Sequence, residues 1–130
     1  MRFASERKFR IWDYNVSHNQ LLLRSPKSPE VAKNIDIVFW GVEYIGIPAA
    51  LDGIELAQVE KDDKARRELL PGESREAANV YRLASSQTQY FVVASGFKVL
   101  ENELDIFDSS LEYFGAPDPA RDLGEVLSHS

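Results

Sequence analysis

The stretch IDIVFWGVEYIGI, residues 35–47, carries the strongest indication of the fold. Its apolar residues follow one another with little polar interruption, which is typical of a β-strand covered on both faces. Such a strand lies in the middle of a protein, so we expect Trp40 in the hydrophobic core. Gly41 and Gly46 indicate a bulge or a close approach of another backbone. Pro48 ends the segment.

Further strand-like segments lie on both sides of this stretch, because β-branched and aromatic residues recur in short runs bounded by turn residues. These segments are residues 9–16 (FRIWDYNV), 20–24 (QLLLR), 54–59 (IELAQV), 80–84 (VYRLA), 89–95 (QYFVVAS) and 97–101 (FKVLE). The sequences SHN (17–19) and SSQT (85–88) have turn chemistry and predict two β-hairpins.

Helical signals are fewer. Residues 62–70 predict one short helix, with Asp62 or Asp63 as its N-cap and Pro71 as its end. Residues 103–115 combine a helical spacing of apolar residues with Asp and Ser, which favour turns, and predict irregular structure or a second short helix. The chain therefore predicts a mainly β fold, an antiparallel barrel or sandwich of six or seven strands with one or two short helices. The alternative is an α+β fold.

The length of 130 residues predicts a single domain spanning residues 1–130. Residues 116–130 contain breaker residues and predict a mobile or loosely docked C-terminal tail. Residues 1–10 carry four basic residues against one acidic residue, a net charge of +3. Residues 101–130 carry eight acidic residues and only Arg121, a net charge of −7. These two ends are either solvated separately or form patches of opposite charge that meet, within one molecule or between two.

Composition excludes several functions. The chain has no cysteine, which removes thiol catalysis, thiolate zinc sites and disulfides, and we expect a cytoplasmic location. No run approaches the ~18 apolar residues of a membrane span, so no membrane association is expected. The net charge of −6 disfavours nucleic-acid binding. Without a glycine-rich phosphate loop or a spaced set of ligands, we expect no cofactor and no metal.

Asp13 and His18 are the candidates for catalysis. If residues 9–16 form a regular strand, Trp12 and Tyr14 share one face and Asp13 lies among apolar neighbours on the other. That carboxylate could serve as an acid or base, or accept backbone hydrogen bonds at a bulge or edge. His18 is the natural general base of the chain, but its place between Ser17 and Asn19 is more typical of a turn.

A ligand site is the other possibility. Aromatic side chains and one arginine could line the pocket of a barrel, and the candidates are Trp12, Tyr14, Arg24, Trp40 and Tyr44. Aromatic residues in strands more often form the core, and a lone arginine on a strand is usually an exposed residue paired with a carboxylate.

Three functions follow, in order of preference. The first is a non-catalytic, soluble interaction module that binds a protein partner or self-associates as a homo-oligomer. The second is a β-barrel that holds a small ligand in an aromatic-lined cavity. The third is a hydrolase-type enzyme that uses Asp13 and His18, and we do not favour an enzyme because no recognisable nucleophile setting accompanies them.

Overall fold

A computed structural model describes residues 2–70, 78–111 and 124–129, which form nine β-strands and one short helix. The strands are β1 (Arg2–Asn15), β2 (Gln20–Ser25), β3 (Asn34–Trp40), β4 (Tyr44–Gly46), β5 (Ala50–Gln58), β6 (Asn79–Ser85), β7 (Thr88–Ala94), β8 (Gly96–Asn102) and β9 (Glu125–His129). The helix α1 spans Lys64–Leu69. The predicted mainly β class is confirmed, although nine strands form where six or seven are expected. The α+β alternative does not fit, because the described residues contain one helix of six residues.

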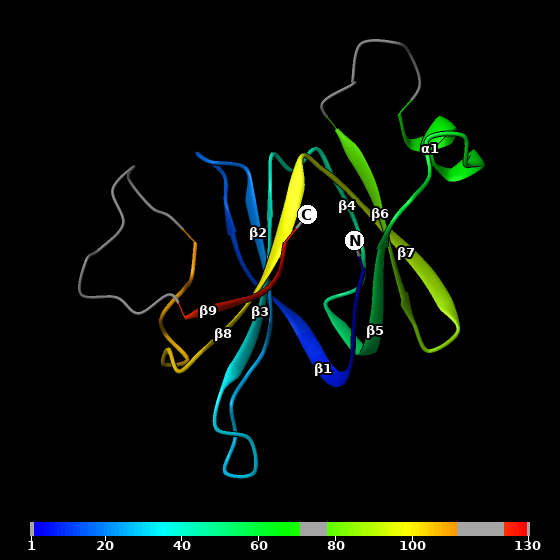
Figure 1. The fold of residues 1–130 in the computed structure, drawn as a ribbon. Coiled ribbons are helices and arrows are strands. Elements are labelled where there is room, and N and C mark those ends of the chain that lie inside the picture. The colour runs from blue at the N-terminus through cyan, green and yellow to red at the C-terminus, as the bar shows by residue number, and fades with distance from the viewer. Residues whose placement is uncertain (1, 71–77, 112–123, 130) are drawn as a thin grey trace.

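The nine strands form one sheet in the order β4-β7-β6-β5-β1-β2-β3-β8-β9, with every neighbouring pair antiparallel. The long strand β1 pairs with β5 from Arg2 to Arg10 and with β2 from Arg10 to Asn15. It therefore belongs to two packed layers (Figure 1). The first layer is the start of β1 with β5, β6, β7 and β4, and the second layer is the end of β1 with β2, β3, β8 and β9. The sheet does not close on itself, so the arrangement resembles a sandwich more than a barrel.

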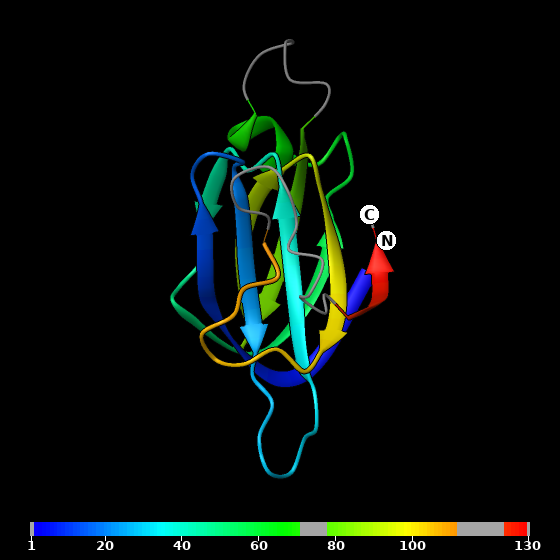
Figure 2. The same ribbon diagram turned by 90° about the vertical axis from the view of Figure 1, so that its left-hand side faces the viewer.

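The main core lies between the two layers, and in Figure 2 the second layer lies in front of the first. Phe39 and Phe97 of the second layer meet Tyr81 of the first layer, with ring centroids 5.2–6.0 Å apart. All three side chains are fully buried. Burial of apolar area from both layers supplies the main stabilisation, at roughly 25 cal/mol for each Å² removed from water.

The sequence of strand β3 is almost continuously apolar because both faces of the strand are covered. Ile37 and Phe39 point into the main core, whereas Val38 points to the outer face of the second layer, the side away from the main core. Residues 103–111 cover that outer face, and Leu111 packs against Val38 there. Both faces are thus buried over most of the strand, as the sequence predicts.

The expectation that Trp40 lies in the core is wrong. Alternation along β3 puts Trp40 on the outer face, opposite Gly96, where it is half-buried. Its indole ring lies 5.6 Å from the ring of His129 in β9. Covering of the outer face is therefore weaker at this end of the strand, which the run of apolar letters does not reveal.

Residues 35–47 form two strands instead of one. Gly41 has a φ of +62°, and a side chain there would collide with that of Ser95. The chain turns at this point and crosses from the second layer to the first, where β4 pairs with β7. Gly41 thus makes the close approach that its position in the sequence predicts, but at a corner between layers.

Strand β1 is also less regular than predicted. A bulge between Ile11 and Asp13 leaves Trp12 without a partner in the register, so Asp13 lies opposite Leu22 and Tyr14 opposite Leu21. Residues directly opposite on paired strands share a face, and Leu22 and Leu21 point to opposite sides of the layer. Trp12 packs on the cluster of Leu22, so the expectation that it shares a face with Tyr14 is wrong.

Three local predictions are confirmed. Strands β6 and β7 form a hairpin whose turn residues Ser86 and Gln87 both have positive φ, of 48° and 65°. Strands β1 and β2 form the other hairpin. Asp63 caps α1, since its Oδ1 accepts a hydrogen bond of 2.8 Å from the N–H of Ala65. The predicted stop at Pro71 lies outside the described residues.

The C-terminal segment differs from its prediction. Residues 125–129 form strand β9, paired with β8, where we expect a mobile or loosely docked tail. Residues 116–123 lie outside the described part. Residues 103–111 are irregular and turn-rich, as predicted. Among the helices of the described residues, none has the length and apolar character needed to cross a membrane.

Candidate interaction surfaces

The predicted catalytic pair is not assembled by any described contact. The Nδ1 atom of His18 lies 3.0 Å from Ser17 Oγ and 3.3 Å from Asn15 Nδ2, so its ring bonds within its own turn. Asn15 Oδ1 also accepts from the N–H and hydroxyl of Ser17. Asp13 is half-buried on β1. Neither Asp13 nor His18 lines any of the described hollows.

The predicted ligand residues are dispersed. Trp12 and Arg24 are together, with the guanidinium carbon 5.4 Å from the centre of the indole ring. Trp40 lies at the other end of the second layer beside β9, and Tyr44 is 47% exposed on the edge strand β4. Tyr14 is on the opposite face of its layer from Trp12. The structure thus brings two of the five together, on the outer face and away from the filled interior.

Arg24 is the centre of a buried polar network on the outer face of the second layer. It lies directly opposite Asp36 in the β2–β3 pairing, and both side chains are fully buried. Arg24 Nε donates to Asp36 Oδ1 at 2.6 Å, and Nη2 donates to Oδ2 at 2.8 Å. This bidentate geometry gives a strong charge-assisted pair and leaves the Nη1 group for other acceptors.

The network continues through two asparagines. Asn102 Nδ2 donates to Asp36 Oδ2 at 2.8 Å, and Asn102 Oδ1 accepts from Asn34 Nδ2 at 2.8 Å. Asn34 also donates to the carbonyl of Leu104 at 2.8 Å. Buried polar groups need such partners, because each one left without a partner costs about 1–3 kcal/mol. The asparagines therefore fix the start of residues 103–111 on the sheet.

The free end of Arg24 fixes the rest of that segment. Its Nη1 group donates to the carbonyl of Asp108 at 2.8 Å and to that of Asp105 at 3.4 Å. The N–H of Asp108 donates to the same Asp105 carbonyl at 2.9 Å, which closes a turn. We call residues 105–108 the pinned turn. Its two corner carbonyls are held by one buried, already paired guanidinium.

The tip of the pinned turn is apolar. Ile106 is 59% exposed and Phe107 is 92% exposed. Turn tips usually carry Gly, Pro, Asn, Asp or Ser, which suit the backbone and the solvent. Phe107 in particular gains almost no burial from the fold of the described residues. The turn therefore places an apolar tip on the surface of the described residues.

The pinned turn is also negatively charged. Asp105 and Asp108 flank the two apolar residues and are both exposed. Within the described part of the chain, neither carboxylate takes part in an ion pair. The buried pair of Arg24 and Asp36 beneath them is neutral as a unit, so it cancels none of this charge.

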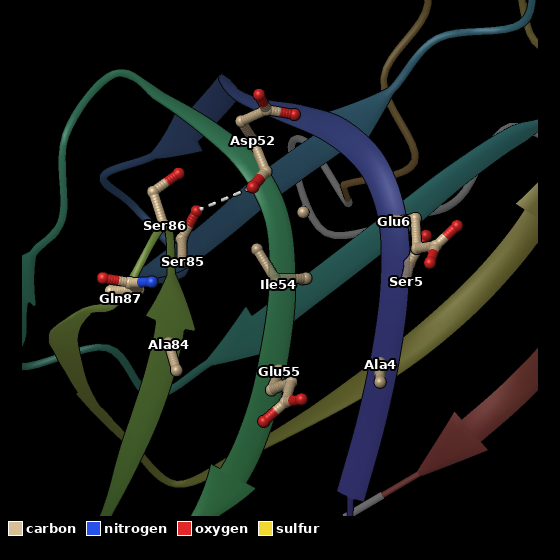
Figure 3. A pocket seen from close by; sticks show the side chains of 11 residues that line it. Ala4, Ser5, Glu6, Asp52, Ile54, Glu55, Ala84, Ser85, Ser86 and Gln87 are labelled. Carbon is tan, nitrogen blue, oxygen red and sulfur yellow. Dashed lines mark hydrogen bonds between the residues drawn. The ribbon is translucent and has the colours of Figure 1, made fainter.

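A second surface is a trough on the outer face of the first layer, with a volume of about 670 Å³ (Figure 3). Ala4, Glu55 and Ala84 are directly opposite one another on β1, β5 and β6, and the short alanine side chains leave the hollow. Ser85 Oγ donates to the carbonyl of Asp52 at 3.2 Å along its rim.

The groups in the trough do not converge. The carboxylates of Glu6, Asp52 and Glu55 point away from one another in Figure 3. No group of acidic and histidine side chains in the described residues is arranged to hold a metal ion. A small-ligand site normally needs a few polar groups aimed at one point, and the trough lacks that arrangement.

Sequence reasoning missed the pinned turn, although a signal was present. The sequence DIFD (105–108) places two apolar residues between two aspartates. The helical spacing of Leu104, Phe107 and Leu111 instead predicts that all three side chains share one buried face. In the structure Leu104 and Leu111 are buried, and Phe107 is exposed. Asp36 lies within an apolar run, and a carboxylate in such a place indicates a buried cationic partner, which is Arg24.

The chain matches no protein-family model, no curated protein and no solved structure.

Proposed function

We propose that this protein is a non-catalytic interaction module that binds a protein partner through the pinned turn. The observation that carries the proposal is the 92% exposure of Phe107 on a turn whose carbonyls are held by the buried Arg24. Aromatic side chains are the usual anchors of protein interfaces, because they bury a large area with few rotatable bonds.

Rigidity supports the same proposal. A flexible loop loses conformational freedom when it binds, at a cost of about 0.5–1.5 kcal/mol for each ordered side chain and more for the backbone. The pinned turn is already bonded to Arg24 at two carbonyls, and Arg24 is bonded to Asp36 at two oxygens. Folding has therefore already removed much of the backbone freedom of this turn, and binding a partner loses less conformational entropy.

The proposed location is the cytoplasm. It rests on the absence of cysteine from a chain of 130 residues, which fits a reducing compartment.

Photocrosslinking tests the binding role. A photoreactive phenylalanine analogue is placed at residue 107 and, as a matched control, at Tyr14, which is 38% exposed on another surface. After irradiation in an extract of the cells that make the protein, residue 107 is expected to give an adduct of defined mass. Excess unlabelled wild type should compete for it, and excess Phe107→Ser should not.

Equal adducts from positions 107 and 14 would contradict the proposal, and so would equal competition by wild type and Phe107→Ser. The variant remains folded, since an exposed side chain far from other features changes stability by no more than about 0.5 kcal/mol. Circular dichroism and urea unfolding verify this.

A further inference from the structure

The charge around the tip indicates what kind of partner it fits. Asp105 and Asp108 stand on either side of Ile106 and Phe107, and no described cation pairs with them. Lys27 lies nearby, but its ammonium donates to the backbone carbonyl of Glu103 at 2.6 Å. The apolar tip thus carries two carboxylates that form no ion pair among the described residues.

A symmetric contact between the pinned turns of two copies is a poor match for that surface. Two pinned turns packed against each other would bring four aspartates together, and like charges facing each other across an interface oppose binding. The net charge of −6 adds a general repulsion between copies.

Building on the proposed function, we propose that the pinned turn seats in an apolar pocket of a different protein whose rim carries lysine or arginine side chains. Ile106 and Phe107 fill the pocket, and the rim cations face Asp105 and Asp108. Affinity then comes mainly from the buried apolar side chains, whereas the charges select the partner and speed its approach.

The photocrosslinking probe at residue 107 tests this through its dependence on charge. The double variant Asp105→Asn and Asp108→Asn removes both tip charges and preserves side-chain size. We expect its adduct yield to fall about three- to tenfold at about 0.01 M salt, where charges interact over roughly 30 Å. The difference should vanish at about 1 M salt, where that range is about 3 Å.

The matched control is the double variant Glu6→Gln and Glu55→Gln in the trough, which changes net charge by the same amount at exposed sites. It should leave the adduct yield within twofold of wild type. Equal losses in the two double variants would show that only net charge matters and would overturn the inference. An adduct with twice the mass of the chain would also overturn it, because the occupant would then be a second copy.

The possible failures are distinguishable. If residue 107 gives no specific adduct, the proposed function itself fails, and this inference fails with it. If a specific adduct forms but ignores Asp105 and Asp108 at every salt concentration, the binding role stands and the basic-rimmed partner is wrong.

Discussion

Each layer carries on its outer face an arginine that contacts an aspartate and an aromatic ring, and the two sets differ in burial. In the second layer, Arg24 pairs with Asp36 under Trp12. In the first layer, Arg82 pairs with Asp63, and its guanidinium carbon lies 5.6 Å from the ring centre of Phe91. The residue types are nearly the same.

The geometry of the two sets is unlike. Arg24 and Asp36 share two bonds of 2.6 and 2.8 Å, and their side chains are 1% and 0% exposed. Arg82 and Asp63 share one contact of 3.3 Å, and about a third of each side chain is exposed. The Nε atom of Arg82 is buried without a hydrogen-bond partner in the described structure. Burial, rather than residue type, decides how much stability the protein loses when one member of such a pair is removed.

The largest expected effect is that of Asp36→Ala. It leaves the Arg24 guanidinium buried and unpaired and should lower the free energy of unfolding by about 3–5 kcal/mol, as measured by urea denaturation. A loss below about 1 kcal/mol would remove the distinction between the two pairs. If the variant does not fold at all, Asp36→Asn provides a milder version of the same test.

Arg24→Lys comes next. Lysine keeps the charge but cannot bond both oxygens of Asp36 and the carbonyls of the pinned turn together. We expect a loss of about 1.5–3 kcal/mol and faster proteolysis within residues 103–111. Arg82→Lys is the matched control and should cost no more than about 0.5 kcal/mol.

Asp63→Ala removes the cap of α1 and should lower the urea midpoint at pH 7 by less than Arg24→Lys does. Asp63→Asn should cost less, because asparagine still accepts the hydrogen bond from Ala65. That backbone hydrogen bond chiefly, with help from Arg82, holds the pKa of Asp63 below its usual value.

The lowered pKa of Asp63 fixes the sign of a pH effect. Its stabilising contribution is complete above the unfolded-state value of about 3.9 and is lost as the pH falls through the lower folded-state value. The stability gap between wild type and Asp63→Asn should therefore be constant near neutral pH and close in acid. A gap that widens in acid would contradict this account.

The smallest expected effect is that of Arg82→Met. It removes a long, partly exposed ion pair and a buried Nε atom that has no hydrogen-bond partner among the described residues, while the methionine still covers Phe91. These changes oppose each other, so the urea midpoint should move by no more than the equivalent of about 0.5 kcal/mol. A loss comparable to that of Asp36→Ala would show that exposure does not separate the two pairs.

The sequence predicts local structure well and contacts between distant strands poorly. The β6–β7 hairpin and the cap of α1 depend on neighbouring residues, so the order of turn and capping residues suffices for both. The Arg24–Asp36 pair depends on the register of β2 against β3. Twelve positions separate the two residues in sequence, and their letters alone do not show that they meet.

The errors have similar causes. The run at residues 35–47 does not show that Gly41 turns the chain into the other layer. Regular alternation along β1 fails at Trp12 because a bulge adds one residue. Strand β9 has little strand signal of its own and forms against the edge of β8. In each case the deciding contact comes from a distant segment.

The sharing of β1 between the layers has a consequence for cooperativity. Opening either layer must free one half of β1, while the other half of β1 stays paired in the other layer. The two pairings meet at Arg10, which lies opposite both β2 and β5. The layers are therefore expected to open as a single unit. Amide hydrogens in the middle of β3 and of β6 should exchange with solvent through the same global unfolding event and show the same dependence on denaturant.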